Sequence, residues 1–281
     1  MGKNRRIFNE DVEYGKLKSV IEEELGISEE VKLLANKMAR KIAEDYKPGY
    51  TLKVTPFSEK CGEYTILFDM RDFDKMSEAS REGVEYKGVT YFTKKEIWVF
   101  GFTVKGRLLL PNLYEVLQHE LKHVYDLYKS GRNGFLEKKN GAKIYTIAAT
   151  QATNKSLPEE QRAIGYAVYL SHDFEGQAFE SGTYAYLMKQ NLSFIGDEVE
   201  AVKDTMYYKR LMFVRYAYDF IWNNEERARE IAESIYGKNL NWLKRTVGVS
   251  LKMARRQIGR AVAKVRNDYD WTHGGSSTVW A

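Results

Sequence analysis

Hydrophobic and polar positions in the first part of the chain predict a helix followed by a small β-sheet. Over 28–46, apolar residues recur every three or four positions after a serine, which is the pattern of a helix. The segments 50–57, 64–70 and 89–104 are instead rich in β-branched and aromatic residues, as strands are. We expect these segments to lie together in a small mixed sheet.

The remainder of the chain has the hydrophobic spacing of helices. Residues 113–128 carry apolar side chains at helical spacing, with Pro111 near the start. The pattern predicts an almost wholly helical chain from Pro158 onward, and 239–267 has the pattern of one amphipathic helix. Breaks between helices are expected near 170–171, 191–196, 223–224 and 237–241. The predicted fold class is α+β, with the sheet packed on the helix over 113–128 and a mostly helical C-terminal half.

Length and composition allow one large domain. With 281 residues and 43% hydrophobic content the chain can bury a substantial core. We predict a single domain over 1–281, made of an α/β part over 1–130 and a helical part over 155–267. No apolar run reaches membrane-spanning length, and the basic N-terminus lacks the apolar stretch of a signal peptide. The one cysteine, Cys61, rules out an intrachain disulfide, so we expect a cytoplasmic or virion protein.

One predicted helix carries a carboxylate on its apolar face. On a helical wheel Glu120 falls inside the apolar arc of 113–128, where an unpaired charge would be costly. His119 and His123 are four residues apart and face the same side, and histidines at this spacing can both bind one Zn²⁺ ion. The glutamate between them can accept a proton from a metal-bound water. The competing interpretation is a pair of surface histidines beside a salt-bridged glutamate.

The five residues HELKH, 119–123, resemble the signature of the zincin metallopeptidases. The resemblance implies a zincin-like fold in which His119 and His123 bind Zn²⁺ and Glu120 is the general base of peptide-bond hydrolysis by a metal-activated water. It also implies an edge strand along the substrate cleft, for which 94–104 is the candidate.

A third zinc ligand is expected further along the chain. Glu175 and Ala178 match the Glu-x-x-Ala pattern that several zincin families use on their second zinc helix, where the glutamate is the third ligand and the alanine lets the helices approach. His172 and Glu180 are the alternatives to Glu175. Phe179 stands where the commoner form of this pattern has an aspartate.

Two supporting roles are open to other residues. Asp126 lies beside the histidines on the helical wheel and could accept an imidazole N–H, although it could equally be an exposed helix carboxylate. The resemblance implies a second donor for the oxyanion, often a tyrosine or histidine, and the candidates are Tyr166, Tyr184, Tyr186 and His172.

The positive charge of the chain belongs to one segment. The net charge is +5, and residues 238–266 contain nine Lys or Arg and no Asp or Glu. Within this segment basic residues recur every four positions, which would place them in one stripe: Lys252, Arg256, Arg260 and Lys264. Such a stripe could bind nucleic acid or an acidic partner, whereas the competing interpretation is a solvated helix face.

The leading hypothesis is a zinc metalloendopeptidase that acts on a protein or peptide substrate. The alternative is a zincin-like structural protein, for example of a phage particle, whose basic helix binds nucleic acid or a protein partner. A protease of DNA-bound proteins, similar to the SprT-like group, is intermediate between them and would favour His172 as third ligand.

Overall fold

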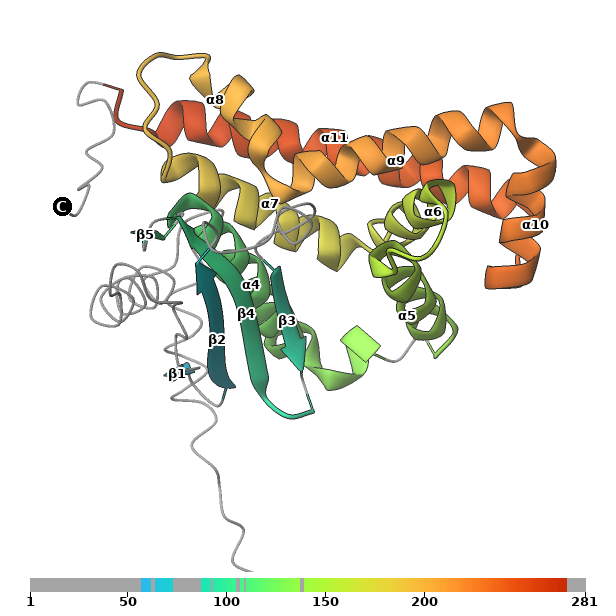
Figure 1. Cartoon of the computed structure of the whole chain (residues 1–281), viewed down its shortest axis with the longest axis horizontal. Helices are drawn as coiled ribbons and strands as arrows, with labels where there is room; N and C mark the ends of the chain where they lie inside the picture. The colour runs from blue at the N-terminus through green and yellow to red at the C-terminus, as the bar shows by residue number, and fades with distance from the viewer. Residues whose placement is uncertain are drawn as a thin grey trace, which may run out of the picture. The chain divides into compact units, whose positions relative to one another are not determined.

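In a computed structural model (Figure 1) the chain forms two units, Met1–Leu108 and Leu109–Ala281. The helix predicted over 28–46 and most of the strand predicted over 50–57 lie outside the described residues. That the units form a single domain, with the sheet packed on the histidine helix, stays a prediction. The structure describes 57–61, 64–72, 87–91, 93–104, 107–108, 110–136 and 139–271.

The described part of the first unit is a small mixed sheet, as predicted. Its strands are β1 (Phe57–Cys61), β2 (Tyr64–Asp72), β3 (Lys87–Tyr91), β4 (Glu96–Val104) and β5 (Arg107–Leu108). The strand order is β1-β2-β4-β3, and β5 pairs with the end of β4. β2 and β4 are parallel, whereas the other pairs are antiparallel.

The segment 89–104 is a hairpin of β3 and β4, with Lys95 at φ 54° in the connection. The prediction that 94–104 forms an edge strand is wrong, because β4 pairs with β2 on one side and with β3 on the other. Burial of Ile97 and Val99 agrees with this internal position. The outer strands of the described path are β1 and β3.

The described part of the second unit is helical (Figure 1). The predicted breaks are confirmed, but an additional break precedes Thr205, whose hydroxyl accepts the Tyr208 N–H and caps α9. No helix in the described part of the chain is both long and apolar enough to span a membrane. The helices are α4 (Leu110–Leu136), α5 (Lys139–Thr153), α6 (Glu159–Tyr169), α7 (Asp173–Met188), α8 (Asp197–Ala201), the 3₁₀ turn η2 (Val202–Asp204), α9 (Met206–Asn223), α10 (Glu225–Tyr236) and α11 (Leu240–Asp268).

Helix α7 lies between α4 and α11 and contacts both of them (Figure 1). Most residues of α7 from Glu175 to Leu187 are buried, and they include small residues such as Gly182 and Ser181. A buried hydrogen bond of 2.9 Å runs from Gln118 Nε2 on α4 to Ser181 Oγ on α7. Small residues on α7 therefore let its backbone approach α4 closely, which positions the site described below.

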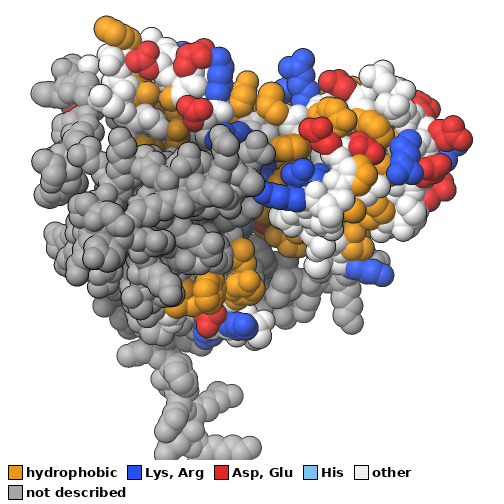
Figure 2. All heavy atoms as spheres, viewed as in Figure 1, with side chains coloured by type: hydrophobic (Ala, Val, Ile, Leu, Met, Phe, Trp, Pro, Cys, Tyr) orange, Lys and Arg blue, Asp and Glu red, His pale blue; other side chains and the backbone are white. Residues whose placement is uncertain are grey.

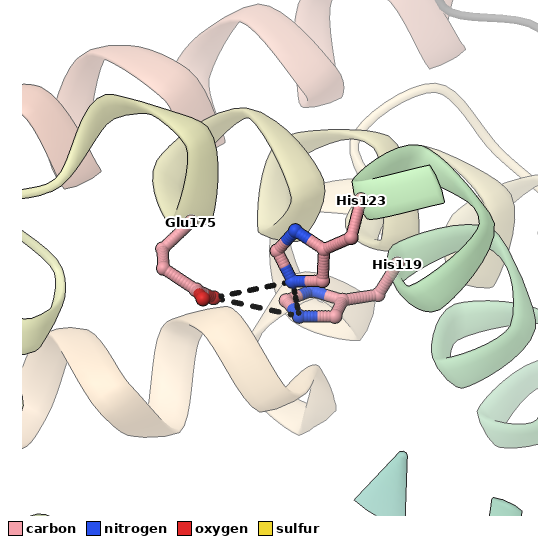
Figure 3. Close-up of side chains that lie close together, drawn as sticks. All are labelled: His119, His123 and Glu175. Atoms are coloured by element: carbon pink, nitrogen blue, oxygen red, sulfur yellow. Dashed lines mark hydrogen bonds and ion pairs between the residues drawn. The ribbon is translucent and has the colours of Figure 1, made fainter. Parts of the chain in front are cut away.

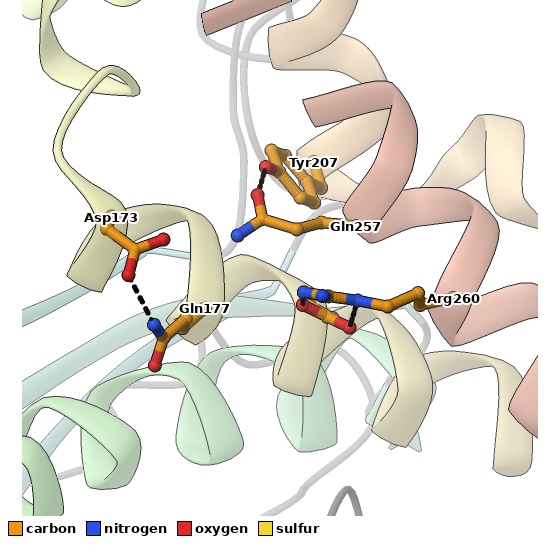
Figure 4. A network of polar contacts seen from close by, with 6 residues as sticks. Asp173, Gln177, Tyr207, Gln257 and Arg260 are labelled. Atoms are coloured by element: carbon orange, nitrogen blue, oxygen red, sulfur yellow. Dashed lines mark hydrogen bonds and ion pairs between the residues drawn. The ribbon is translucent and has the colours of Figure 1, made fainter. Parts of the chain in front are cut away.

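Polar side chains join α7 to α11 (Figure 4). Arg260 donates from Nε to Glu180 Oε1 at 2.7 Å and from Nη2 to Glu180 Oε2. Gln257 accepts a hydrogen bond from Tyr207 and lies against Gly176 of α7. The basic stripe predicted for α11 is therefore partly engaged within the protein, because Arg260 serves to hold α7.

Candidate metal centre

Helix α4 buries both motif histidines. Its apolar residues Leu113, Val116, Leu117, Leu121 and Val124 are buried, which fixes the inward face of the helix. His119 and His123 are 5% and 6% exposed, one turn apart on this buried side. The interpretation of these residues as surface histidines is therefore wrong.

Glu175 reaches the two histidines from the first turn of α7 (Figure 3). Its side chain is 1% exposed, and the positive end of the helix favours a carboxylate there. Glu175 Oε2 lies 3.6 Å from His119 Nε2 and 3.5 Å from His123 Nε2, and the two Nε2 atoms are 3.1 Å apart. We call these residues the His–His–Glu group.

The spacing of these three atoms fits one metal ion. Tetrahedral ligands with bonds of about 2.0–2.1 Å lie about 3.3 Å from one another, close to the observed separations. Glu175 Oε2 is buried and accepts no hydrogen bond from a described residue. A buried carboxylate oxygen without a donor is costly, and a cation between the three atoms would satisfy it. The His–His–Glu group can therefore hold a metal ion.

The protonation states of Glu175 and His119 suit metal binding. Burial raises the pKa of Glu175, but His123, His119 and the Tyr145 hydroxyl outweigh it and lower that pKa to about 2. Burial and neighbouring His123 lower the pKa of His119 to about 3. Burial also lowers the pKa of His123, yet the charge of Glu175 outweighs burial and raises it above 6.5. Glu175 is thus ionised and His119 neutral near pH 7, as metal ligands must be, whereas His123 favours its protonated form beside Glu175 and would release that proton to a bound metal.

The two alternative third ligands lie outside the group. His172 precedes α7, and its ring makes an edge contact with Tyr145 at 5.3 Å. Glu180 is paired with Arg260 on the opposite side of α7. Phe179, which stands where the commoner form of the Glu-x-x-Ala pattern has an aspartate, packs with its ring centroid 4.2 Å from that of His119.

Glu120 and Asp126 both act on the centre through their charges. Glu120 is 5% exposed. Burial and Glu175 have the largest effects on the pKa values of His123 and Tyr145, and the charge of Glu120 adds a smaller increase to both. Asp126 forms an ion pair with Lys122 and also raises the pKa of His123. The Nδ1 atom of His123 makes no hydrogen bond with a described residue, so the predicted bond from an imidazole to Asp126 is absent.

The three tyrosines named as candidate oxyanion donors make contacts outside the His–His–Glu group. Tyr184 donates to Asp268 Oδ2 at 2.8 Å, and the Tyr166 ring packs 5.0 Å from that of Phe213. Tyr186 interacts with Gln190 beyond the end of α7. His172, the fourth candidate, packs its ring against Tyr145. A tyrosine or histidine as oxyanion donor stays a prediction without a residue assigned to it.

Two tyrosines beside Glu175 are absent from the sequence-based candidates. Tyr145 of α5 donates its hydroxyl to Glu175 Oε1 at 2.6 Å, and Tyr169 at the end of α6 interacts with both. Thirty positions separate Tyr145 from Glu175, and the segment carrying Tyr145 has no clear periodicity. The sequence offered one signal for this contact: Tyr169 lies only six positions before Glu175, so it could have been considered as a neighbour of that ligand.

Comparison with known proteins does not place the chain in a family. No family model, curated protein or solved structure matches it. The zincin resemblance therefore rests on the HELKH residues and on the geometry of the His–His–Glu group. Membership of that family and the identity of the metal stay predictions.

Proposed function

We propose that the protein is a zinc-dependent metallopeptidase whose metal is held by His119, His123 and Glu175. The observation that carries the proposal is the convergence of three buried ligand atoms from two helices, 3.1–3.6 Å apart. Two nitrogens and one carboxylate oxygen are the donor set of many catalytic zinc sites, which keep a further position open. Zinc is favoured over Ca²⁺ or Mg²⁺ because those ions prefer oxygen ligands alone.

Glu120 is the general base in this proposal. A bound zinc ion would supply Lewis-acid polarisation of the scissile carbonyl and would lower the pKa of the attacking water. Glu120 shares a turn of α4 with both histidines and is buried, as they are. In the proposed reaction its carboxylate takes a proton from the attacking water and passes it to the amine that leaves when the C–N bond breaks.

Exchange of Glu120 tests the proposal. The zinc-loaded full chain is incubated with a peptide library, in parallel with Glu120→Gln and with Glu226→Gln, an exposed glutamate of α10. We expect Glu120→Gln to retain zinc and to lose about 10²–10⁴-fold in cleavage rate. The Glu226→Gln control should cleave as the wild type does. A wild type that holds zinc and cleaves no peptide, or an active Glu120→Gln, would overturn the peptidase proposal.

A second candidate function is binding of a nucleic-acid backbone by α11. Arg245, Lys252 and Arg256 are exposed and make no ion pair with a described residue. At about 100° per residue these three positions fall within about 40° on one face of the helix. On the face that Figure 2 shows, Lys and Arg lie among acidic side chains. The proposed contact is made by these three cations.

Salt dependence tests this second candidate. Binding of labelled single- and double-stranded oligonucleotides is measured by fluorescence anisotropy from low to physiological salt. The proposed contact with three phosphates predicts an affinity that falls with salt, with a slope of log K against log salt near −2 to −3. Exchange of the three basic residues to alanine should abolish binding. A wild type without measurable affinity at low salt would exclude this function.

A further inference from the structure

Helix α5 contributes a contact to the metal centre through Tyr145. The phenol donates to Glu175 Oε1 at 2.6 Å, while the other carboxylate oxygen, Oε2, is the one near the two histidines. The two oxygens of this ligand thus have different surroundings. Oε1 has a donor from the protein, whereas Oε2 has none among the described residues.

The ring of Tyr145 is held by aromatic neighbours on several sides. It stacks on Tyr169 with 5.2 Å between centroids and 27° between planes. His172 and Phe174 contact it at 5.3 Å each. A side chain packed in this way loses little further conformational entropy when it donates its hydrogen bond. The hydroxyl is therefore already directed at Glu175.

We propose that Tyr145 is a positioning residue that fixes Glu175 as a one-oxygen metal ligand. An unrestrained carboxylate rotates about its terminal bond and can offer either oxygen or both to a metal. The hydrogen bond to Oε1 keeps that oxygen away from the metal and leaves Oε2 in place between His119 and His123. Outer hydrogen bonds of this kind commonly raise metal affinity 10- to 100-fold by orienting the ligand.

One-oxygen ligation also bears on the choice of metal. A carboxylate that offers one oxygen beside two imidazoles supports four-coordination, which zinc prefers. A two-oxygen carboxylate supports the higher coordination numbers of larger ions. This inference rests on the proposed function in one respect, because it requires that the His–His–Glu group binds a metal.

The test compares zinc affinity of wild type, Tyr145→Phe and Tyr236→Phe by competition with a fluorescent chelator. Tyr236 of α10 is the matched control. Its buried hydroxyl also donates a hydrogen bond to a side chain, that of Gln151, which lies on α5 as Tyr145 does. We expect Tyr145→Phe to weaken zinc binding 10- to 100-fold and Tyr236→Phe to change it less than about twofold. Thermal unfolding of the metal-free variants shows whether each one folds. Should Tyr145→Phe not fold, Tyr145→Gln keeps an N–H donor and is expected to bind zinc more tightly than Tyr145→Leu.

The cobalt-substituted protein gives a second measurement that a general loss of stability would not change. The visible absorption of Co²⁺ is strong in four-coordinate sites and weaker when more ligands bind. The inference predicts weaker absorption in Tyr145→Phe, with the wild-type spectrum retained in Tyr236→Phe. Equal zinc affinity and equal spectra for wild type and Tyr145→Phe would overturn the inference while the metal site itself stands. A wild type that binds no zinc would instead overturn the proposed function, and the inference with it.

Discussion

Gly182 of α7 lies so close to Glu115 of α4 that a Cβ atom at position 182 would stand 2.7 Å from the Glu115 carbonyl oxygen. Real Cβ atoms do not approach a backbone oxygen so closely, and a backbone atom cannot swing aside as a side chain can. This contact brings together the two helices that carry the His–His–Glu group. The distances among the ligand atoms of His119, His123 and Glu175 therefore depend on position 182 being a glycine, which has no Cβ atom.

The first prediction concerns Gly182→Ala. Alanine normally stabilises a helix interior by up to about 1 kcal/mol relative to glycine. At position 182 we expect the reverse, a loss of about 1–3 kcal/mol in unfolding free energy, because the helices must separate. Zinc affinity should fall with it. Chemical denaturation and chelator competition measure the two effects.

Gly248→Ala is the matched control for this prediction. Gly248 lies in α11, and a Cβ atom there would meet nothing within 4 Å. This variant should therefore be as stable as the wild type or more so, with unchanged zinc affinity. If both alanine variants are stabilised equally, the helix contact at Gly182 is looser than described.

The second prediction concerns Glu115, which is 1% exposed and accepts the Met206 N–H at 2.7 Å. Burial raises its pKa from 4.5 to about 8. Between these values the unfolded chain releases a proton that the folded protein keeps, so this residue lowers the unfolding free energy as pH rises. Below 4.5 both states are protonated, and the effect disappears.

Glu115→Gln removes this titration. The stability of the variant relative to the wild type should rise between pH 4.5 and 8, by on the order of 3–5 kcal/mol. Urea denaturation of both metal-free proteins across this pH range measures the difference between their unfolding free energies. The contributions of the other titrating groups cancel in that difference. A difference that stays constant with pH would show that Glu115 is ionised in the folded protein throughout.

The third prediction separates two arginines of α11 that are one turn apart. Arg260 forms a two-pronged pair with Glu180, whose side chain is 5% exposed. Arg260→Ala should cost about 1–3 kcal/mol, because a buried carboxylate loses its partner. Arg256 is exposed and makes no ion pair with a described residue, so Arg256→Ala should change stability by less than about 0.5 kcal/mol.

A double variant checks the cause of the Arg260 effect. Adding Glu180→Gln to Arg260→Ala removes the unpaired charge and should recover part of the lost stability. Additive losses would mean that the guanidinium contributes by packing and not by pairing with Glu180.

Much of the helical unit could be predicted from local sequence, because helix ends depend on nearby residues. Gly237 adopts a positive φ of 61° just after α10, and the Asn239 side chain caps α11. The β3–β4 hairpin was missed because its connection, residues 92–95, contains none of the Gly, Pro or Asn residues that usually mark a turn. The internal position of β4 depends on pairing with β2, which no local pattern reveals.

The candidate site also contains residues that local sequence predicts and contacts that it does not. His119 and His123 follow from helical spacing, and Glu175 followed from a short motif. The pairing of Arg260 with Glu180 and the contact of Tyr145 with Glu175 join residues far apart in the sequence. Such contacts depend on how helices pack, so the basic stripe predicted from spacing alone includes a residue that the structure uses internally.

Zinc-edge X-ray absorption, combined with metal content by mass spectrometry, tests whether His119, His123 and Glu175 hold zinc. We expect one zinc per chain in the wild type, coordinated by two imidazoles and by oxygen with no sulfur. We expect no tightly bound zinc in a His119→Ala/His123→Ala double variant. A wild type without zinc after incubation with the metal, or a double variant that binds it equally well, would contradict the account.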